Sequence, residues 1–229
     1  MRIDQLLSHM KYGSRKEIQK ILKHHIITSN GVRIESVKTH VNPDSDQIAI
    51  DGQVIFYRFP IDLVFYKPKG YLSANRDPKY PCVTEWIKPP FDRFDFSIAG
   101  RLDLDAEGLL ILTTDGHFVH EITHPNKHLP KIYEVVLDKD FHHHGTLLNG
   151  VVIKDGHQKD FIAKALSISS IGNHAIISID EGKFHQVKRM FLSVGYQVLQ
   201  LKRTQIGNLR LNGLRPGEYR MFERSELYL

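Results

Sequence analysis

The chain has 229 residues, of which 41% are hydrophobic, which is enough to bury the core of one large domain or of a small and a medium one. No apolar stretch approaches the roughly 18 residues of a membrane span, and the first residues lack the pattern of a signal peptide, so we expect a cytoplasmic protein with no membrane partner. The single cysteine, Cys82, excludes an internal disulfide and a zinc site built from cysteines. The net charge of +5 fits a polyanionic partner, but it also fits many ordinary proteins.

Residues 1–59 predict a separate small unit of two helices and a small sheet. Asp4 can cap a first helix that ends near Gly13, and Ser14 with Glu17 forms a capping box at the start of a second helix. Short strands follow, with turn-forming pairs between them. The predicted strands and turns are 26–28, Asn30-Gly31, 32–34, 47–50, Asp51-Gly52 and 53–56.

The second predicted helix has one basic face. Its members are Arg15, Lys16, Lys20 and Lys23. A stripe of this kind is most often a solvated helix face, although it can also contact the phosphates of a nucleic acid.

Three segments of this unit resemble the alpha-L RNA-binding module, which occurs in a ribosomal small-subunit protein, in tyrosyl-tRNA synthetases and in many rRNA-modifying enzymes. The segments are Arg2-x-Asp4-x-x-Leu7, Gly13-Ser14-Arg15 and Asn30-Gly31-Val32. The resemblance implies that the basic helix lies on RNA. It assigns RNA contacts to the matching cations Arg2, Arg15, Lys16 and Lys20.

Residues 60–229 predict a second domain with longer strands and scattered short helices. The predicted strands are 63–66, 96–99, 109–113, 132–137, 161–168, 175–179 and 198–201, and the predicted helices are 117–123, 142–148 and 184–194. Most of these strands follow one another without an intervening helix. We therefore expect an α+β fold with a mixed, largely antiparallel sheet.

Three carboxylates lie between two glycines, directly before the predicted strand 109–113. They are Asp103, Asp105 and Glu107. Their spacing imitates the start of a calcium loop, but Thr114 stands where the closing glutamate is needed. A magnesium-dependent phosphoesterase would need a second acidic cluster, which the sequence does not contain. The 14 histidines include no His-Glu-x-x-His pattern, so we expect no metal site.

A second polar cluster lies at the start of the predicted helix 184–194, beside apolar residues that must face a core. Its members are Lys183, Gln186, Lys188 and Arg189. Taken alone, the segment is typical of an amphipathic helix with a basic outer face. A functional interpretation instead places one of its cations against a carboxylate of the earlier loop.

Five segments resemble, in the same order, the motifs of the pseudouridine synthases that modify ribosomal RNA. They are Lys67-Pro68-Lys69-Gly70, Gly100-Arg101-Leu102-Asp103 with Gly108-Leu109-Leu110, Lys131-Ile132-Tyr133, Phe184-His185-Gln186-Val187-Lys188-Arg189-Met190, and Ile206-Gly207 with Leu214-Arg215-Pro216-Gly217-Glu218-Tyr219. Together with the amino-terminal module, the resemblance covers nearly the whole chain.

The resemblance implies a role for each motif. Asp103 would act on the ribose, either as a nucleophile or as a base on a sugar proton, and Lys188 would favour its ionised form. Tyr133 would stack on the uracil, and Arg101 would fill the space of the displaced nucleotide or bind its phosphate. The isomerisation has no redox step, so no cofactor is expected. The remaining polar groups of the motifs would contact the RNA: Lys67, Lys69, Lys131, His185, Gln186 and Arg189.

The third motif is more similar to that of the small-subunit enzyme, because large-subunit relatives more often have arginine at the position of Lys188. We therefore expect an enzyme that isomerises one uridine of 16S ribosomal RNA. We also expect the protein to be a monomer. Two alternatives stay open: the same reaction on 23S ribosomal RNA, and a non-catalytic RNA-binding factor in ribosome assembly.

Overall fold

The computed structural model describes residues 1–123 and 129–228, which fold into two compact units. The first unit comprises Met1–Ile61 and Lys88–Asp95, and the second comprises Asp62–Ile87 and Phe96–Leu229. Within the described residues, no helix combines the length and the apolar character that crossing a membrane requires.

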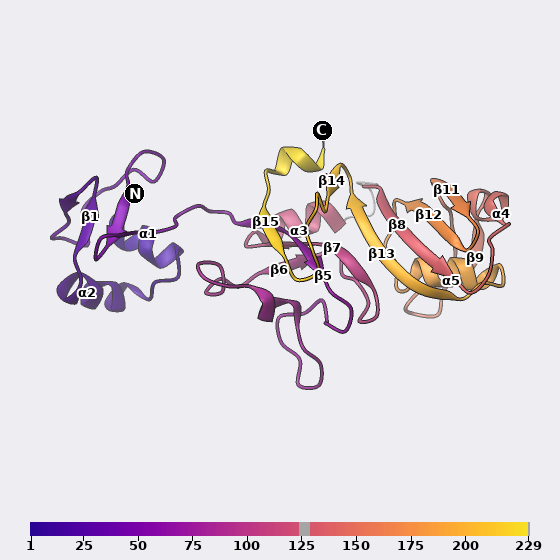
Figure 1. Ribbon diagram of the computed structural model, residues 1–229. Coiled ribbons are helices and arrows are strands. Elements are labelled where there is room, and N and C mark those ends of the chain that lie inside the picture. The colour runs from indigo at the N-terminus through magenta and orange to yellow at the C-terminus, as the bar shows by residue number, and fades with distance from the viewer. Residues whose placement is uncertain (124–128, 229) are drawn as a thin grey trace. The chain divides into compact units, whose positions relative to one another are not determined.

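The first unit contains two helices and a four-stranded antiparallel sheet in the order β2-β1-β3-β4 (Figure 1). The elements are α1 (Ile3–His9), α2 (Arg15–His24), β1 (Ile27–Ser29), β2 (Val32–Arg33), β3 (Ile48–Ile50) and β4 (Gln53–Val54). The predicted capping box is present, since the Glu17 carboxylate accepts a hydrogen bond from the Ser14 amide at 2.7 Å. The predicted cap of α1 is wrong, because Arg2 is the cap residue and Asp4 lies buried in the first turn.

The segment Lys88–Asp95 belongs to the first unit although it follows residue 60 in the sequence. The Phe91 ring packs edge-on against Phe56, with ring centroids 5.1 Å apart. The Arg93 guanidinium lies 4.1 Å from the centroid of the Tyr12 ring. The predicted division into 1–59 and 60–229 did not contain this return of the chain, because aromatic contacts between distant segments leave no local periodicity.

The second unit is built on a mixed sheet of nine strands in its described part, with the order β11-β12-β8-β13-β7-β5-β15 and with β14 and β6 paired at its side. Every neighbouring pair is antiparallel except β13 with β7. The predicted α+β class with a largely antiparallel sheet is confirmed. The strands are β5 (Asp62–Lys67), β6 (Ser97–Ala99), β7 (Glu107–Thr113), β8 (Lys131–Leu137), β11 (Ser167–Ile171), β12 (His174–Ile179), β13 (Val198–Ile206), β14 (Leu209–Arg210) and β15 (Tyr219–Met221).

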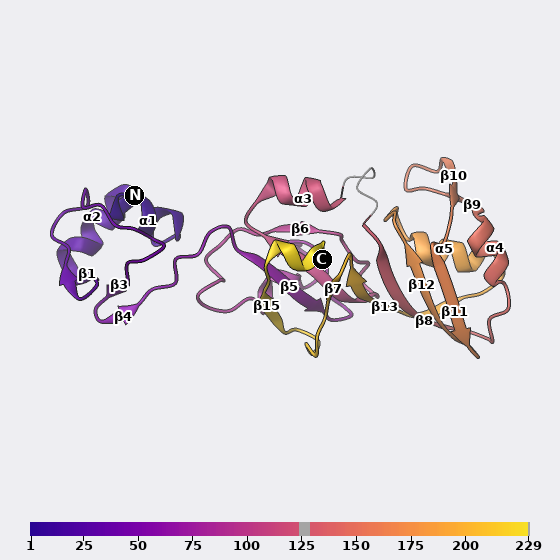
Figure 2. The same cartoon turned by 90° about the horizontal axis from the view of Figure 1, so that it is seen from above.

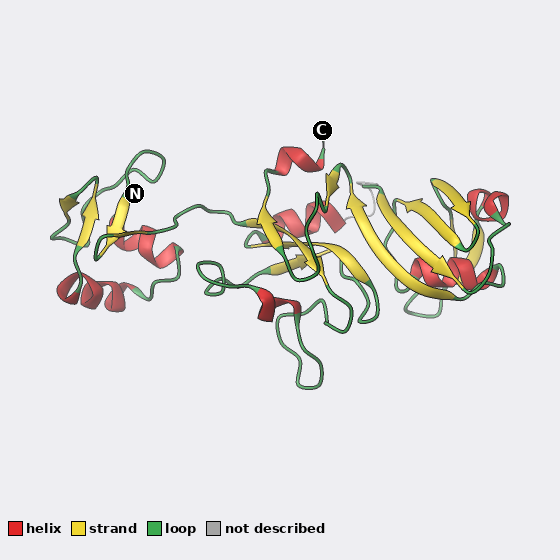
Figure 3. Cartoon of the chain, viewed as in Figure 1, coloured by secondary structure: helices red, strands yellow, loops and turns green. Residues whose placement is uncertain are grey.

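Short helices and a two-stranded ribbon lie around this sheet. Strands make up most of the regular structure of the second unit (Figure 3). The helices and the ribbon strands are η1 (Val83–Trp86), α3 (Gly116–Thr123), α4 (His144–Asn149), β9 (Val151–Lys154), β10 (Asp160–Ala163), α5 (Gln186–Ser193) and η3 (Arg224–Leu227). The single strand predicted over 161–168 is wrong: it is divided between β10 and β11, which belong to different sheets.

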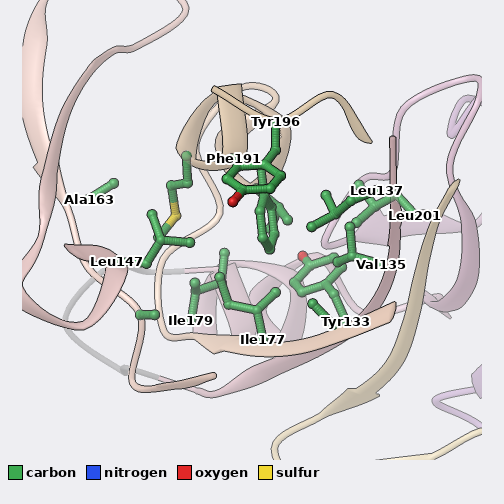
Figure 4. Packing of buried hydrophobic residues seen from close by; sticks show 14 of the residues in the cluster. Tyr133, Val135, Leu137, Leu147, Ala163, Ile177, Ile179, Phe191, Tyr196 and Leu201 are labelled. Atoms are coloured by element: carbon green, nitrogen blue, oxygen red, sulfur yellow. The ribbon is translucent and has the colours of Figure 1, made fainter. Parts of the chain in front are cut away.

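Two hydrophobic clusters stabilise the second unit. One joins β8, β12 and β13 to α4 and α5, and Figure 4 shows Phe191 and Tyr196 facing Ile177 and Val135 across it. The other joins β5 and β7 to α3, which Figure 2 shows beside β6. The long strand β13 runs through both parts of the sheet (Figure 1). The site described below lies where β13 meets β7 and β8.

Candidate active site

The carboxylate loop, residues 100–106, connects β6 to β7 and is held by backbone hydrogen bonds on both sides of Asp103. The Ser73 hydroxyl donates to the Leu102 carbonyl at 2.8 Å and accepts from the Leu102 amide at 3.0 Å. On the other side, the Gly70 amide donates to the Leu104 carbonyl at 2.8 Å. The loop therefore holds Asp103 between two fixed neighbours.

The Lys67 amine adds a third attachment to this loop. It donates to the Ala106 carbonyl at 2.7 Å and to the Leu104 carbonyl at 3.4 Å. Burial lowers the pKa of Lys67 to about 8, and the charges of Asp103 and Asp105 act in the opposite direction. The structure contradicts the predicted phosphate contact of Lys67, because the side chain is completely buried under the loop.

Asp103 lies against the start of α5. One carboxylate oxygen is 3.2 Å from Lys188 Nζ, and the other is 3.2 Å from His185 Nε2. His185 is the residue directly before α5 and has the left-handed φ of 52°, which is uncommon for a residue other than glycine. The predicted placement of a cation of this helix against the loop carboxylate is thus confirmed, and the catalytic role of the pair stays a prediction.

Lys188 also binds a second carboxylate that the sequence analysis gave no role. Its Nζ atom is 2.5 Å from Asp105, closer than it is to Asp103. Although burial raises the pKa of Asp105, the hydrogen bond and charge of Lys188 outweigh that effect and lower it overall. Lys188 is therefore shared between two acids.

A cavity of about 480 Å³ opens beside Asp103. Its lining includes Arg101, Asp103, Lys131, Tyr133, His185 and Arg203. The volume lies within the range of roughly 300–1,000 Å³ that is typical of small-molecule sites. The cavity thus brings together three of the four predicted catalytic residues, and the fourth, Lys188, lies outside the lining but 3.2 Å from Asp103.

The predicted RNA-contacting residues of the second unit occupy different environments. Lys69 is exposed. Lys131 is only 9% exposed and donates to the carbonyls of Leu129 and Asp180, and burial lowers its pKa to about 8. Arg189 is partly buried and donates to the carbonyls of Lys154 and Asp155.

Gln186 is 3% exposed and forms a local cap at the start of α5. Its amide oxygen accepts from the Lys183 amide at 3.0 Å, and its amide nitrogen donates to Glu181 at 3.1 Å. Gln186 also lines the cavity, and its RNA contact stays a prediction. The two hydrogen bonds indicate that the residue fixes the turn that presents His185 and Lys188.

Arg203 is the main residue of the site that the sequence analysis missed. It lies on β13, is 2% exposed and lines the cavity. A signal was available, because the period-two alternation of a strand places Arg203 on the same face as the buried Leu201.

The predicted RNA-contacting residues of the first unit lie on its surface. Arg15, Lys16 and Lys20 are exposed on α2. Arg2 is partly exposed, and its guanidinium pairs with Asp4 at 2.6 Å. Among the described residues, no group of three or more metal-ligating side chains is placed to hold an ion.

Comparison with known proteins identifies the class to which this site belongs. Residues 62–193 match the family described as RNA pseudouridylate synthase, and residues 1–55 match the S4 domain. The chain therefore belongs to the RNA pseudouridylate synthase family and carries an S4 domain at its amino-terminal end.

Individual relatives match over nearly the full length. The chain is 40% identical over 233 residues to an uncharacterised RNA pseudouridine synthase of Bacillus subtilis. This match covers 100% of the chain and 98% of the relative. It is 32% identical over 232 residues to the ribosomal small subunit pseudouridine synthase A of Yersinia pestis, with 99% and 97% covered. A solved structure of a pseudouridylate synthase superposes with a TM-score of 0.66 at 27% identity, covering 99% of this chain and 98% of that chain.

Proposed function

We propose that this chain isomerises one uridine of small-subunit (16S) ribosomal RNA to pseudouridine, with Asp103 acting on the ribose and without a cofactor. The observation that carries the proposal is the position of Asp103. Its carboxylate lies at the wall of a 480 Å³ cavity, 3.2 Å from Lys188 Nζ and 3.2 Å from His185 Nε2. A carboxylate with an ammonium group and an imidazole beside it in a cavity is suited to attack an electron-poor sugar carbon.

The reaction breaks the bond between ribose C1′ and uracil N1 and forms a bond between C1′ and C5. The hydrogen on C5 leaves as a proton, and N1 takes up a proton, so electrons balance without an oxidant or a reductant. Asp103 acts either by attacking C1′ or by removing the neighbouring sugar proton. Both routes need a carboxylate that lies beside the ribose of a flipped nucleotide.

The other side chains of the site bind the RNA. The Tyr133 ring stacks on the uracil inside the cavity, while the exposed Arg101 takes the place of the displaced nucleotide or holds its phosphate. Cations outside the cavity hold flanking phosphates and position the RNA without reading its sequence. These cations are Arg2, Arg15, Lys16, Lys20, Lys69 and Arg189.

The choice of small-subunit RNA is supported by full-length similarity to a relative named for the small ribosomal subunit. The lysine at position 188 supports the same choice. We further propose that the enzyme acts as a monomer in the cytoplasm, where its substrate is assembled.

The proposal is tested with 16S and 23S transcripts that carry tritium at C5 of uracil, in buffer with a chelator. The wild type and Asp160→Asn, an exposed carboxylate of the same unit, should release tritium from one site of the 16S transcript. Asp103→Asn should release none while still binding RNA. Activity of Asp103→Asn overturns the role of this carboxylate, and release from 23S RNA alone overturns the choice of substrate.

A further inference from the structure

Arg203 is a buried cation, and within the described residues its side chain donates hydrogen bonds to uncharged oxygens. The guanidinium Nε atom donates to the Leu109 carbonyl at 2.9 Å, one Nη atom donates to the Gly100 carbonyl, and the other donates to the Tyr133 hydroxyl at 3.4 Å. Burying a guanidinium costs free energy, which such bonds only partly offset. The position therefore calls for a reason beyond packing.

The three acceptors come from the three parts of the site that must be aligned. Gly100 begins the carboxylate loop, and Leu109 lies on β7 directly after that loop. Tyr133 lies on β8 and lines the cavity. One rigid planar group thus spans both ends of the loop that carries Asp103 and also the ring that is proposed to hold the uracil.

The contact with Tyr133 also has a direction. A guanidinium can only donate hydrogen bonds, so the phenol oxygen must be the acceptor. The hydroxyl hydrogen of Tyr133 then points away from Arg203. It remains available to an acceptor on the cavity side, such as an oxygen of the RNA beyond the stacked base.

The backbone around Arg203 leaves room for this arrangement. A Cβ atom at Gly100 would lie 3.4 Å from an Nη atom of Arg203, and one at Gly108 would lie 2.1 Å from the Arg203 carbonyl oxygen. Both glycines that border the loop therefore pack closely against Arg203. This packing is a second observation, separate from the hydrogen bonds, that links Arg203 to the loop.

We propose that Arg203 is a positioning residue that fixes the Tyr133 hydroxyl relative to the Asp103 loop, so that the base and the ribose of one nucleotide meet their partners at the same time. This inference rests on the proposed function. It adds a residue outside the segments that contain Asp103, Tyr133 and Lys188. A displacement of about 1 Å between reacting groups can reduce a rate about 100-fold, so a loss of this alignment should affect kcat.

The test combines Arg203→Lys, Tyr133→Phe and the double variant, with Arg220→Lys as the matched control. Arg220 on β15 is also an arginine of the large sheet, but it pairs with Glu226 on η3. Arg203→Lys keeps the charge and loses the planar fork. Initial rates on the RNA that the wild type modifies give kcat and KM, and thermal unfolding checks the fold.

Arg203→Lys should lower kcat about 10- to 100-fold and leave KM within about twofold, and it should lower the melting temperature by several degrees without abolishing cooperative unfolding. In the Tyr133→Phe background, the fold decrease in kcat caused by Arg203→Lys should be at least about threefold smaller, because the hydrogen bond between the two side chains is already absent. Equal costs in the two backgrounds, or wild-type kcat in Arg203→Lys, overturn the proposal. A loss confined to KM overturns it as well.

A second measurement does not depend on substrate. Tyrosine labelled with ¹³C at Cζ gives an NMR signal for Tyr133, which Tyr133→Phe assigns by its disappearance. Arg203→Lys should shift this signal, whereas Arg220→Lys should not. If the wild type is inactive on every RNA tested, the proposed function fails, while the NMR shift still decides whether Arg203 holds Tyr133.

Discussion

Lys67 and Lys131 place ammonium groups inside the second unit, where water cannot solvate them. Burial is the largest effect on both and lowers the pKa of each lysine to about 8. Backbone carbonyls replace the lost water around each amine. Lys131 lines the cavity, so its charge adds to the positive potential there.

The lowered pKa of Lys67 has a consequence for stability. Between pH 8 and pH 10.5 the unfolded chain holds a proton on Lys67 that the folded chain has lost, so this residue adds stability as the pH rises. The free energy of unfolding of the wild type should therefore rise relative to Lys67→Met by up to about 3 kcal/mol over this window. Urea unfolding of both proteins at pH 7.5 and pH 10 measures the difference, and a difference that does not change with pH would contradict the assignment.

The sharing of Lys188 between two acids gives a second prediction at this scale. Asp105→Asn removes the carboxylate nearest to the amine and leaves Lys188 paired with Asp103 alone. Since Asp103 keeps its partner, tritium release should fall by less than about tenfold. A loss as complete as that of Asp103→Asn would instead assign the catalytic role to Asp105.

At the scale of elements, the active site depends on a close approach of two parallel strands. Gly108 on β7 has a φ of +113° and lies opposite Arg203 on β13. A side chain at Gly108 would collide with the backbone of β13, which cannot move aside without disturbing the sheet. The glycine therefore controls where Arg203 sits relative to the carboxylate loop.

Gly108→Ala should lower the free energy of unfolding by about 2–4 kcal/mol, because it combines a backbone clash with a strained φ. Gly116→Ala is the matched control. Gly116 begins α3 and has no atoms within 4 Å of its would-be Cβ. Urea unfolding compares the two variants. Equal stability of the two would show that the backbone of β13 can shift to accommodate a side chain at position 108.

Local pattern predicts the strands well and buried polar residues poorly. The apolar run 109–113 predicted the core of β7, and the motif at the start of α5 predicted the cation beside Asp103. Lys67 was assigned to the surface because lysine is rarely buried, and the carbonyls that hold it come from a loop some 37 residues away. Strand alternation marks position 203 as buried, but the acceptors of Arg203, Gly100 and Leu109, lie about 100 residues earlier in the sequence, so no spacing along the chain reveals the role of this arginine.

At the scale of the whole molecule, the two units have separate cores and separate chemistry. The first presents an exposed basic helix, and the second holds the cavity. If α2 binds phosphates and the cavity performs the reaction, mutations in the two units should affect different kinetic constants.

The triple change of Arg15, Lys16 and Lys20 to alanine tests this separation. It should raise KM and leave kcat within about twofold, and it should reduce the slope of log affinity against log salt by about 2, since each phosphate contact contributes roughly 0.7–0.9. Arg33→Ala with Lys38→Ala, exposed cations of the same unit outside α2, should have a much smaller effect. An unchanged salt slope in the triple variant would show that α2 does not lie on RNA.

Because Lys88–Asp95 belongs to the first unit, the chain cannot be divided into its two units by a single cut. Cutting the gene near codon 61 leaves the catalytic fragment with an orphaned aromatic loop whose partners, Phe56 and Tyr12, have been removed. Transferring the first unit to another enzyme therefore requires two separate segments, Met1–Ile61 and Lys88–Asp95. Chimaeras that contain only the first sixty residues should expose the apolar surface that Lys88–Asp95 covers, and we expect them to aggregate and to express poorly.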